Sequence, residues 1–121
     1  MITFGNRIKL LTFTVVFFLV FNSASAQWPT TYGIATINSS YCVTIDTSVP
    51  LTEFYQINIV DLNFATEIDA RKVFGNISNN RLSYKVDFAN HVAYLQVHAD
   101  RTQFPQDVIW WNNYIASLCQ N

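Results

Sequence analysis

Residues 81–99, with the sequence RLSYKVDFANHVAYLQVHA, decide the fold of this chain. The segments 81–88 and 92–99 each alternate between apolar and polar side chains, which is typical of a strand with one buried face. Only residues 89–91 separate the two segments, so together they predict an antiparallel hairpin. The predicted core side of this hairpin consists of Leu82, Tyr84, Val86, Phe88, Ala93, Leu95 and Val97.

A helix is predicted on each side of the hairpin. Residues 63–77 have the apolar spacing of a helix, and either Thr66 or Asn63 would serve as its N-cap. After the hairpin, Pro105 suits the first turn of a second helix that ends near Cys119. The apolar stripe expected on this helix is Val108, Trp111, Ile115 and Leu118. Its expected outer side is Asn112, Asn113, Ala116 and Ser117.

The N-terminal half adds strands. Residues 53–62 have strand propensity, and alternate side chains from Tyr55 to Ile59 form the core face. Residues 41–45, around Cys42, predict a short strand, and the polar segment 27–41 predicts an extended arm or an edge strand. From residue 53 the order is β-α-β-β-α, which predicts an α+β two-layer sandwich. We therefore expect an antiparallel sheet with two helices on one face and an extra N-terminal strand.

This order resembles the ferredoxin-like split β-α-β arrangement without its closing C-terminal strand. The Cys42 strand is expected at the vacant edge, which would bring Cys42 close to the end of the second helix. Small heavy-metal-binding domains share the same plan and carry a C-x-x-C motif in the loop before the first helix. The matching loop here is residues 61–64, DLNF, which contains no thiol. The resemblance therefore implies a fold and argues against metal transfer.

The N-terminus predicts export. Arg7 and Lys9 precede an apolar run of 12 residues, 10–21, and residues 24–26 form an A-x-A cleavage pattern. These features predict a signal peptide, residues 1–26, cut after Ala26, because a membrane span needs about 20 apolar residues. The rest is predicted to be one domain, with residues 27–52 as arm and edge strand and residues 53–121 as the β-α-β-β-α core. We expect a secreted or periplasmic protein without a membrane span after cleavage.

Charge and cysteine content narrow the classes of partner. Residues 27–121 contain five Lys or Arg and eight Asp or Glu, a net charge of −3, and their longest basic run is Arg71-Lys72. Nucleic-acid binding needs several cations on one face, so no nucleic-acid partner is expected.

Cys42 and Cys119 are the two cysteines of the chain. Export to an oxidising compartment predicts a disulfide between them rather than two free thiols.

The sequence gives little indication of catalysis or of metal binding. The two histidines, His91 and His98, have opposite parity on their strand and should not converge on a metal. No nucleophile elbow, phosphate-binding glycine loop or zinc motif is present. We therefore expect no enzyme activity, no cofactor and no metal. The residual enzymatic alternative is a minor hydrolase-like activity that uses Asp87, His98 and Asp100.

Two surfaces are candidates for binding. Trp110 and Tyr114 flank the apolar stripe of the second helix, either as an aromatic contact for a partner or as cover for the sheet edge. The sheet face opposite the helices is the preferred candidate, because its side chains suit contacts with another protein or a glycan. Its expected members are Gln56, Asn58, Lys85, Asp87, Tyr94, Gln96 and His98.

The sequence thus predicts a small exported non-catalytic protein, a protein-binding or accessory module of the cell envelope or secretome. The first alternative is a secreted inhibitor or structural factor that pairs with its target through an edge strand, with residues 30–41 as that edge. Truncation of this segment would abolish target binding only under the alternative.

Overall fold

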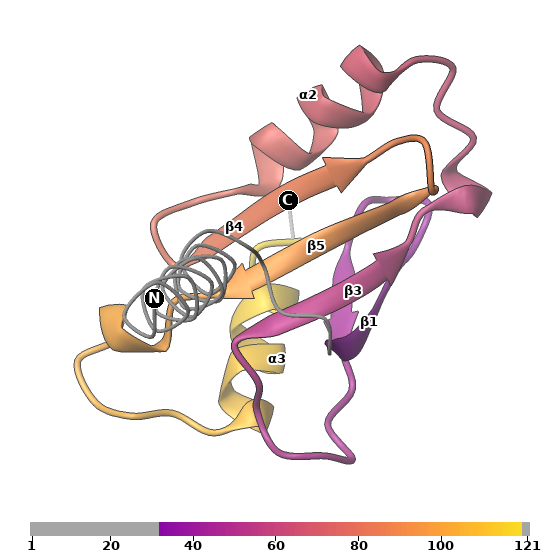
Figure 1. The fold of residues 1–121 in the computed structure, drawn as a ribbon. Helices are drawn as coiled ribbons and strands as arrows, with labels where there is room; N and C mark the ends of the chain where they lie inside the picture. Colours follow the sequence, from indigo (N-terminus) through magenta and orange to yellow (C-terminus); the bar gives the residue numbers. More distant parts are fainter. Residues whose placement is uncertain (1–31, 120–121) are drawn as a thin grey trace, which may run out of the picture. The chain divides into compact units, whose positions relative to one another are not determined.

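The computed structural model describes residues 32–119. The predicted signal peptide and the first residues of the predicted arm lie outside this range. Figure 1 shows strands and helices in the following order. The elements are β1 (Gly33–Ile37), β2 (Val43–Ile45), β3 (Phe54–Asn58), the short 3-10 helix η1 (Val60–Leu62), α2 (Glu67–Ile77), β4 (Leu82–Asp87), β5 (Val92–Val97), η2 (Ala99–Arg101) and α3 (Val108–Ser117).

The strands form one five-stranded sheet in the order β2-β1-β3-β5-β4. The predicted α+β class with two helices is confirmed, but the sheet is mixed and not antiparallel, because β1 and β3 are parallel. The chain reverses at the β1–β2 turn and again in residues 46–53, so β3 regains the direction of β1. The remaining neighbours are antiparallel pairs.

The N-terminal segment lies deeper in the sheet than expected. β1 is an inner strand between β2 and β3, so the prediction of an edge strand over residues 27–41 is wrong. The strand next to Cys42, β2, occupies the outer edge, and β1 takes the place beside β3 that the Cys42 strand was expected to fill. Gly33 permits this close pairing, because a Cβ there would lie 2.6 Å from the ring of Tyr55.

The hairpin is confirmed, with Leu82 opposite Val97 and Asp87 opposite Val92. Strand β3 is shorter than the predicted 53–62. The side chain of Asn58 accepts a hydrogen bond from the backbone N–H of Val60 at 2.9 Å, and the chain turns into η1. Asn63 then adopts a left-handed conformation with φ of 52°, which prevents the first helix from starting at residue 63.

Side-chain caps set both helix starts. Thr66 accepts a hydrogen bond from the N–H of Asp69 at 3.2 Å, so α2 begins at Glu67. Asp107 accepts from the N–H of Trp110 at 2.9 Å, so α3 begins at Val108. Pro105 therefore lies in the preceding loop and not in the first turn as predicted. Within residues 32–119, no helix has the length and apolarity needed to cross a bilayer.

Both helices pack against the same face of the sheet. Phe74 of α2 and the α3 residues Trp111 and Ile115 belong to one buried cluster with the sheet. The sheet residues in this cluster are Ala35, Val43, Ile45, Tyr55, Ile57, Leu82, Ala93, Leu95 and Val97. The pattern of alternation therefore predicted the core face of β3, β4 and β5 correctly. The opposite face is covered by neither α2 nor α3.

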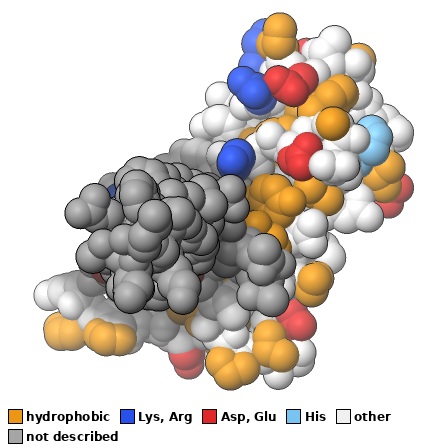
Figure 2. Space-filling model, in the orientation of Figure 1, with side chains coloured by type: hydrophobic (Ala, Val, Ile, Leu, Met, Phe, Trp, Pro, Cys, Tyr) orange, Lys and Arg blue, Asp and Glu red, His pale blue; other side chains and the backbone are white. Residues whose placement is uncertain are grey.

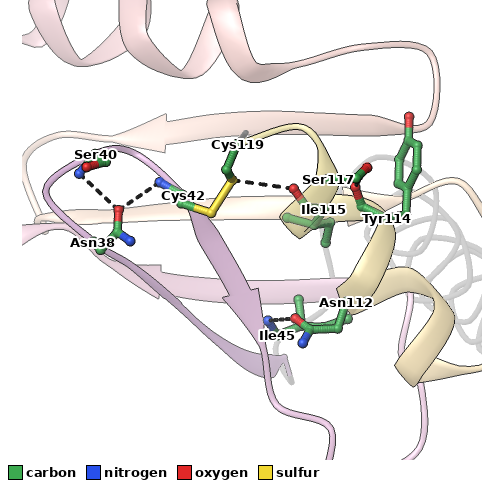
Figure 3. Close-up of a disulfide and its surroundings, with 9 residues drawn as sticks. All are labelled: Asn38, Ser40, Cys42, Ile45, Asn112, Tyr114, Ile115, Ser117 and Cys119. Carbon is green, nitrogen blue, oxygen red and sulfur yellow. Dashed lines mark hydrogen bonds between the residues drawn. A yellow bond between two sulfur atoms is a disulfide. The ribbon is translucent and has the colours of Figure 1, made fainter. Parts of the chain in front are cut away.

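The C-terminal helix is fastened to the outer edge of the sheet at two points (Figure 3). Cys42, just before β2, forms the predicted disulfide with Cys119, just after α3, and their Cα atoms are 5.5 Å apart. The side-chain oxygen of Asn112 accepts a hydrogen bond from the N–H of Ile45 in β2 at 3.0 Å. Asn112 therefore faces the sheet, and its predicted place on the outer side of α3 is wrong. Leu118, predicted in the apolar stripe, is 42% exposed.

Candidate binding face of the sheet

The residues predicted for a binding face lie on one side of the sheet, opposite both helices. The register places Gln56, Tyr94 and Lys85 in one row across β3, β5 and β4. Ile34 of β1 extends this row beyond Gln56. The neighbouring rows contain Phe54, Gln96 and Ser83 on one side and Asn58, Val92 and Asp87 on the other. Alternation along each strand was sufficient to group these residues.

The centre of the face is aromatic. The rings of Tyr32 and Tyr94 lie with their centroids 4.8 Å apart. Desolvation and, secondarily, the charge of an ionised Tyr94 raise the pKa of Tyr32 above its usual 10.0. The hydroxyl of Tyr32 therefore remains protonated at neutral pH and can donate as well as accept hydrogen bonds.

A polar cluster occupies the end of the face near His98. The side-chain amide of Gln96 donates to the carboxylate of Glu53 at 2.8 Å. The hydroxyl of Ser83 lies 2.7 Å from Nε2 of His98. Gln96, Glu53 and His98 border a hollow of about 580 Å³, whose lining is Leu51, Thr52, Glu53, Gln96, Val97, His98, Ala99, Asp100 and Arg101. The hollow offers amide, imidazole, carboxylate and guanidinium groups to a polar ligand.

Ser83 and Glu53 are the members of this cluster that sequence reasoning missed. Ser83 is opposite Gln96 in the hairpin register, so the pairing of the two strands could have identified it. Glu53 precedes β3 and meets Gln96 only because β3 and β5 are neighbours. Nothing in the local sequence around Glu53 indicates this contact.

The residues of the enzymatic alternative are not assembled into one site. Asp87 lies at the far end of β4, where its carboxylate accepts from the amide of Asn90 at 2.8 Å. Ser83, the neighbour of His98, is four residues away along the strand, a separation of about 13 Å. Asp100 does line the same hollow as His98. Within residues 32–119, no group of three or more His, Cys, Asp or Glu side chains could hold a metal ion.

A second hollow lies at the Asn58 end of the face. Its volume is about 500 Å³, and it is lined by Ile34, Ala35, Thr36, Gln56, Asn58, Val60, Asn90, His91 and Val92. The exposed side chains of Ile34 and Val60 give it a more apolar character than the first hollow. The face thus combines a polar end, a central tyrosine row and an apolar end.

The aromatic pair on α3 has structural contacts. The rings of Trp110 and Tyr114 are stacked with centroids 5.5 Å apart, and both pack against the core. The hydroxyl of Tyr114 accepts a hydrogen bond from the side chain of Asn79 at 3.2 Å. The guanidinium of Arg81 lies 5.3 Å from the centre of the Tyr114 ring. These contacts join α3 to the turn before β4, and a contact with a partner stays a prediction.

Charges on the described part of the visible surface are mixed. Figure 2 shows acidic and basic side chains interspersed among polar and apolar ones.

In comparisons with known proteins, no family model, curated protein or solved structure matches this chain. Functional arguments therefore rest on the chain's own residues.

Proposed function

We propose that this protein is a small exported, non-catalytic module that binds another protein through the sheet face opposite its helices. The observation that carries the proposal is the makeup of this face. Rows of amide, hydroxyl and tyrosine side chains lie between a polar hollow and a more apolar one. Such a surface provides hydrogen bonds over its whole area and an aromatic residue near its centre, as protein interfaces do.

Export and fold are part of the same proposal. The predicted signal peptide directs the chain out of the cytoplasm, and the Cys42–Cys119 disulfide suits an oxidising compartment. We also infer a ferredoxin-like relation for the segment from β3 to α3, whose strands lie in the order β3-β5-β4. That architecture supports many functions, so the function is argued from the surface alone.

The edge-strand alternative placed the edge in residues 30–41, but the strand in this segment, β1, is an inner strand. Residues 33–37 form β1, which is paired on both sides, so they cannot accept a further strand. At the outer edge, β2 already has the N–H of Ile45 bonded to Asn112. The other edge strand that such an inhibitor could use is β4.

The test is affinity capture by the mature chain, residues 27–121, from native envelope and culture fractions. The face variant carries Tyr94→Ala, Gln96→Ala and His98→Ala. The matched control carries Ile68→Ala, Arg71→Ala and Lys72→Ala on the exposed side of α2. We expect a partner that the wild type and the control retain and that the face variant loses at least tenfold.

Other outcomes redirect the proposal. Equal retention by the face variant would refute the sheet face as the binding surface. Loss of the partner after enzymatic removal of its glycans would show that the ligand is a glycan. A hydrolytic activity of the wild type that His98→Ala abolishes, with folding intact, would replace the non-catalytic proposal with the enzymatic one.

A further inference from the structure

The helical side of the sheet contains a cleft between the C-terminal ends of α2 and α3. Its volume is about 660 Å³. It is lined by Ser40, Tyr41, Val43, Asn76, Ile77, Ser78, Asn79, Leu82, Tyr84, Ile115, Leu118 and Cys119. Figure 3 shows part of this wall, with Cys119 bonded to Cys42, Ile115 beside the Cys119 sulfur and Ser40 in the turn that precedes Cys42. The size is within the range of small-molecule sites, about 300–1,000 Å³.

The lining of the cleft contains no charged side chain, because none of its residues is a Lys, Arg, His, Asp or Glu. The accessible aliphatic side chains of the lining are those of Ile77 and Leu118, and the buried core residues Val43, Leu82 and Ile115 lie behind them. Serine and asparagine side chains supply the polar groups. An ionised ligand would lose its hydration here without gaining a counter-charge, which is strongly unfavourable.

Tyr84 gives the cleft a polar anchor. Its ring is largely buried and packs 5.6 Å from the ring of Phe74, and this burial raises the pKa of Tyr84 above its usual value. Its hydroxyl makes no hydrogen bond among residues 32–119, and it is not one of the buried unpartnered polar atoms, so water reaches it at the cleft. A ligand can replace this water by a hydrogen bond of its own to the hydroxyl.

Tyr41 is held at the same cleft in an unusual conformation. Its φ is 63°, in the left-handed region that aromatic residues rarely adopt. The side chain of Asn38 accepts hydrogen bonds from the N–H groups of Ser40 and Cys42 at 2.9 and 3.0 Å, and the disulfide fixes the next residue. Strained backbone of this kind is concentrated at functional sites.

We propose that this cleft binds a small uncharged molecule with an apolar body and one hydrogen-bonding group. The apolar body contacts the side chains of Ile77 and Leu118, and the polar group bonds to the hydroxyl of Tyr84. This site is separate from the proposed protein-binding face, because it lies on the other side of the sheet. Its test therefore does not depend on the outcome of the capture experiment.

The test uses two fluorescent probes with the same ring system. N-phenyl-1-naphthylamine is neutral and has one N–H group, and 8-anilinonaphthalene-1-sulfonate differs by one negative charge. We expect the mature chain to bind the neutral probe saturably with one site and to bind the sulfonate at least tenfold more weakly. Near-UV circular dichroism confirms that the chain is folded during the titration.

Two lysine variants locate the site. Leu118→Lys, at the residue directly after α3, puts a charge at the cleft, and Ile109→Lys puts the same charge at an exposed apolar position of α3 outside the cleft. We expect Leu118→Lys to weaken binding of the neutral probe at least tenfold and Ile109→Lys to change it less than twofold. Tyr84→Phe keeps the ring and should weaken binding three- to tenfold.

The proposal is overturned by any of three results: no saturable binding of the neutral probe, equal affinity for the two probes, or equal effects of the two lysine variants. If Leu118→Lys does not fold, the titration of Tyr84→Phe decides, and wild-type affinity in that variant refutes the anchor. Amide chemical shifts give an independent location, and perturbations outside residues 40–43, 76–84 and 115–119 contradict the site.

Discussion

The hydrogen bond from Ile45 to Asn112 is the contact whose removal tests the fold most directly. Asn112→Ala removes the oxygen that accepts from the N–H of Ile45 at 3.0 Å. Ile45 is only 2% exposed, so water replaces the lost acceptor poorly. The adjacent Asn113 is exposed on the same helix, and Asn113→Ala is therefore a matched control.

The magnitude follows from two opposing terms. A buried backbone donor without a partner destabilises the folded state by about 1–3 kcal/mol. Replacement of asparagine by alanine in a helix stabilises it by up to about 0.7 kcal/mol, and this gain is common to both variants. We therefore expect Asn113→Ala to be slightly stabilising and Asn112→Ala to be less stable than Asn113→Ala by about 1–3 kcal/mol.

Urea unfolding followed by tryptophan fluorescence measures this difference, because Trp111 is fully buried in the core. With a slope of about 1–1.5 kcal/mol per molar urea, the two midpoints should differ by about 0.7–3 M. Hydrogen exchange gives a local measurement, and protection of the Ile45 amide should fall in Asn112→Ala. Asn112→Asp keeps an acceptor and should restore part of the lost stability.

Equal unfolding free energies for Asn112→Ala and Asn113→Ala would refute this reasoning. In that case α3 would be held on β2 by the disulfide and by packing alone. Unchanged protection of the Ile45 amide would lead to the same conclusion, because it would show that the N–H is protected without Asn112.

Three further predictions concern stability. Replacing Cys42 and Cys119 by serine opens a covalent loop whose ends are 77 positions apart. This change should lower the unfolding free energy, measured in urea, by up to about 4.5 kcal/mol. A loss below about 1 kcal/mol would contradict the loop-closure argument. Gly33→Ala places a methyl group 2.6 Å from the ring of Tyr55 and should destabilise the fold by about 1–3 kcal/mol. Gly75→Ala has open space around it and should stabilise α2 by about 0.8–1 kcal/mol in the same assay. Burial raises the pKa of Tyr84, so above pH 10 the unfolded chain releases this proton first and stability falls with rising pH. Tyr84→Phe should reduce the slope of unfolding free energy against pH by up to about 1.4 kcal/mol per unit, and an unchanged slope would show that Tyr84 titrates normally.

Local patterns were sufficient for the hairpin, and they reduced the candidates for the cap of α2 to Thr66 and Asn63. Alternation over residues 81–99 determines which side chains share a face, because successive residues of a strand point to opposite sides. Thr66 caps α2 by a bond to the backbone three residues later, an interaction within one turn. The disulfide was predictable because the chain has only two cysteines.

Long-range pairing could not be read from local patterns. Strand β1, Gly33–Ile37, has one buried side chain, Ala35, so nothing in its sequence marks an inner strand. Asn112 looks like a surface residue of a helix until β2 is placed beside α3. Pro105 suits a helix start, but the side chain of Asp107 caps the helix two residues later.

The candidate sites also combine features that the local sequence determines with features that depend on long-range contacts. The sequence by itself determined which residues of β3, β4 and β5 share a face, because strand parity is a local property. Only the tertiary structure decided that Ser83 meets His98 and that Glu53 meets Gln96, since strand register sets the first contact and strand neighbours set the second. The cleft between α2 and α3 is also a tertiary feature, because it depends on where each helix packs on the sheet.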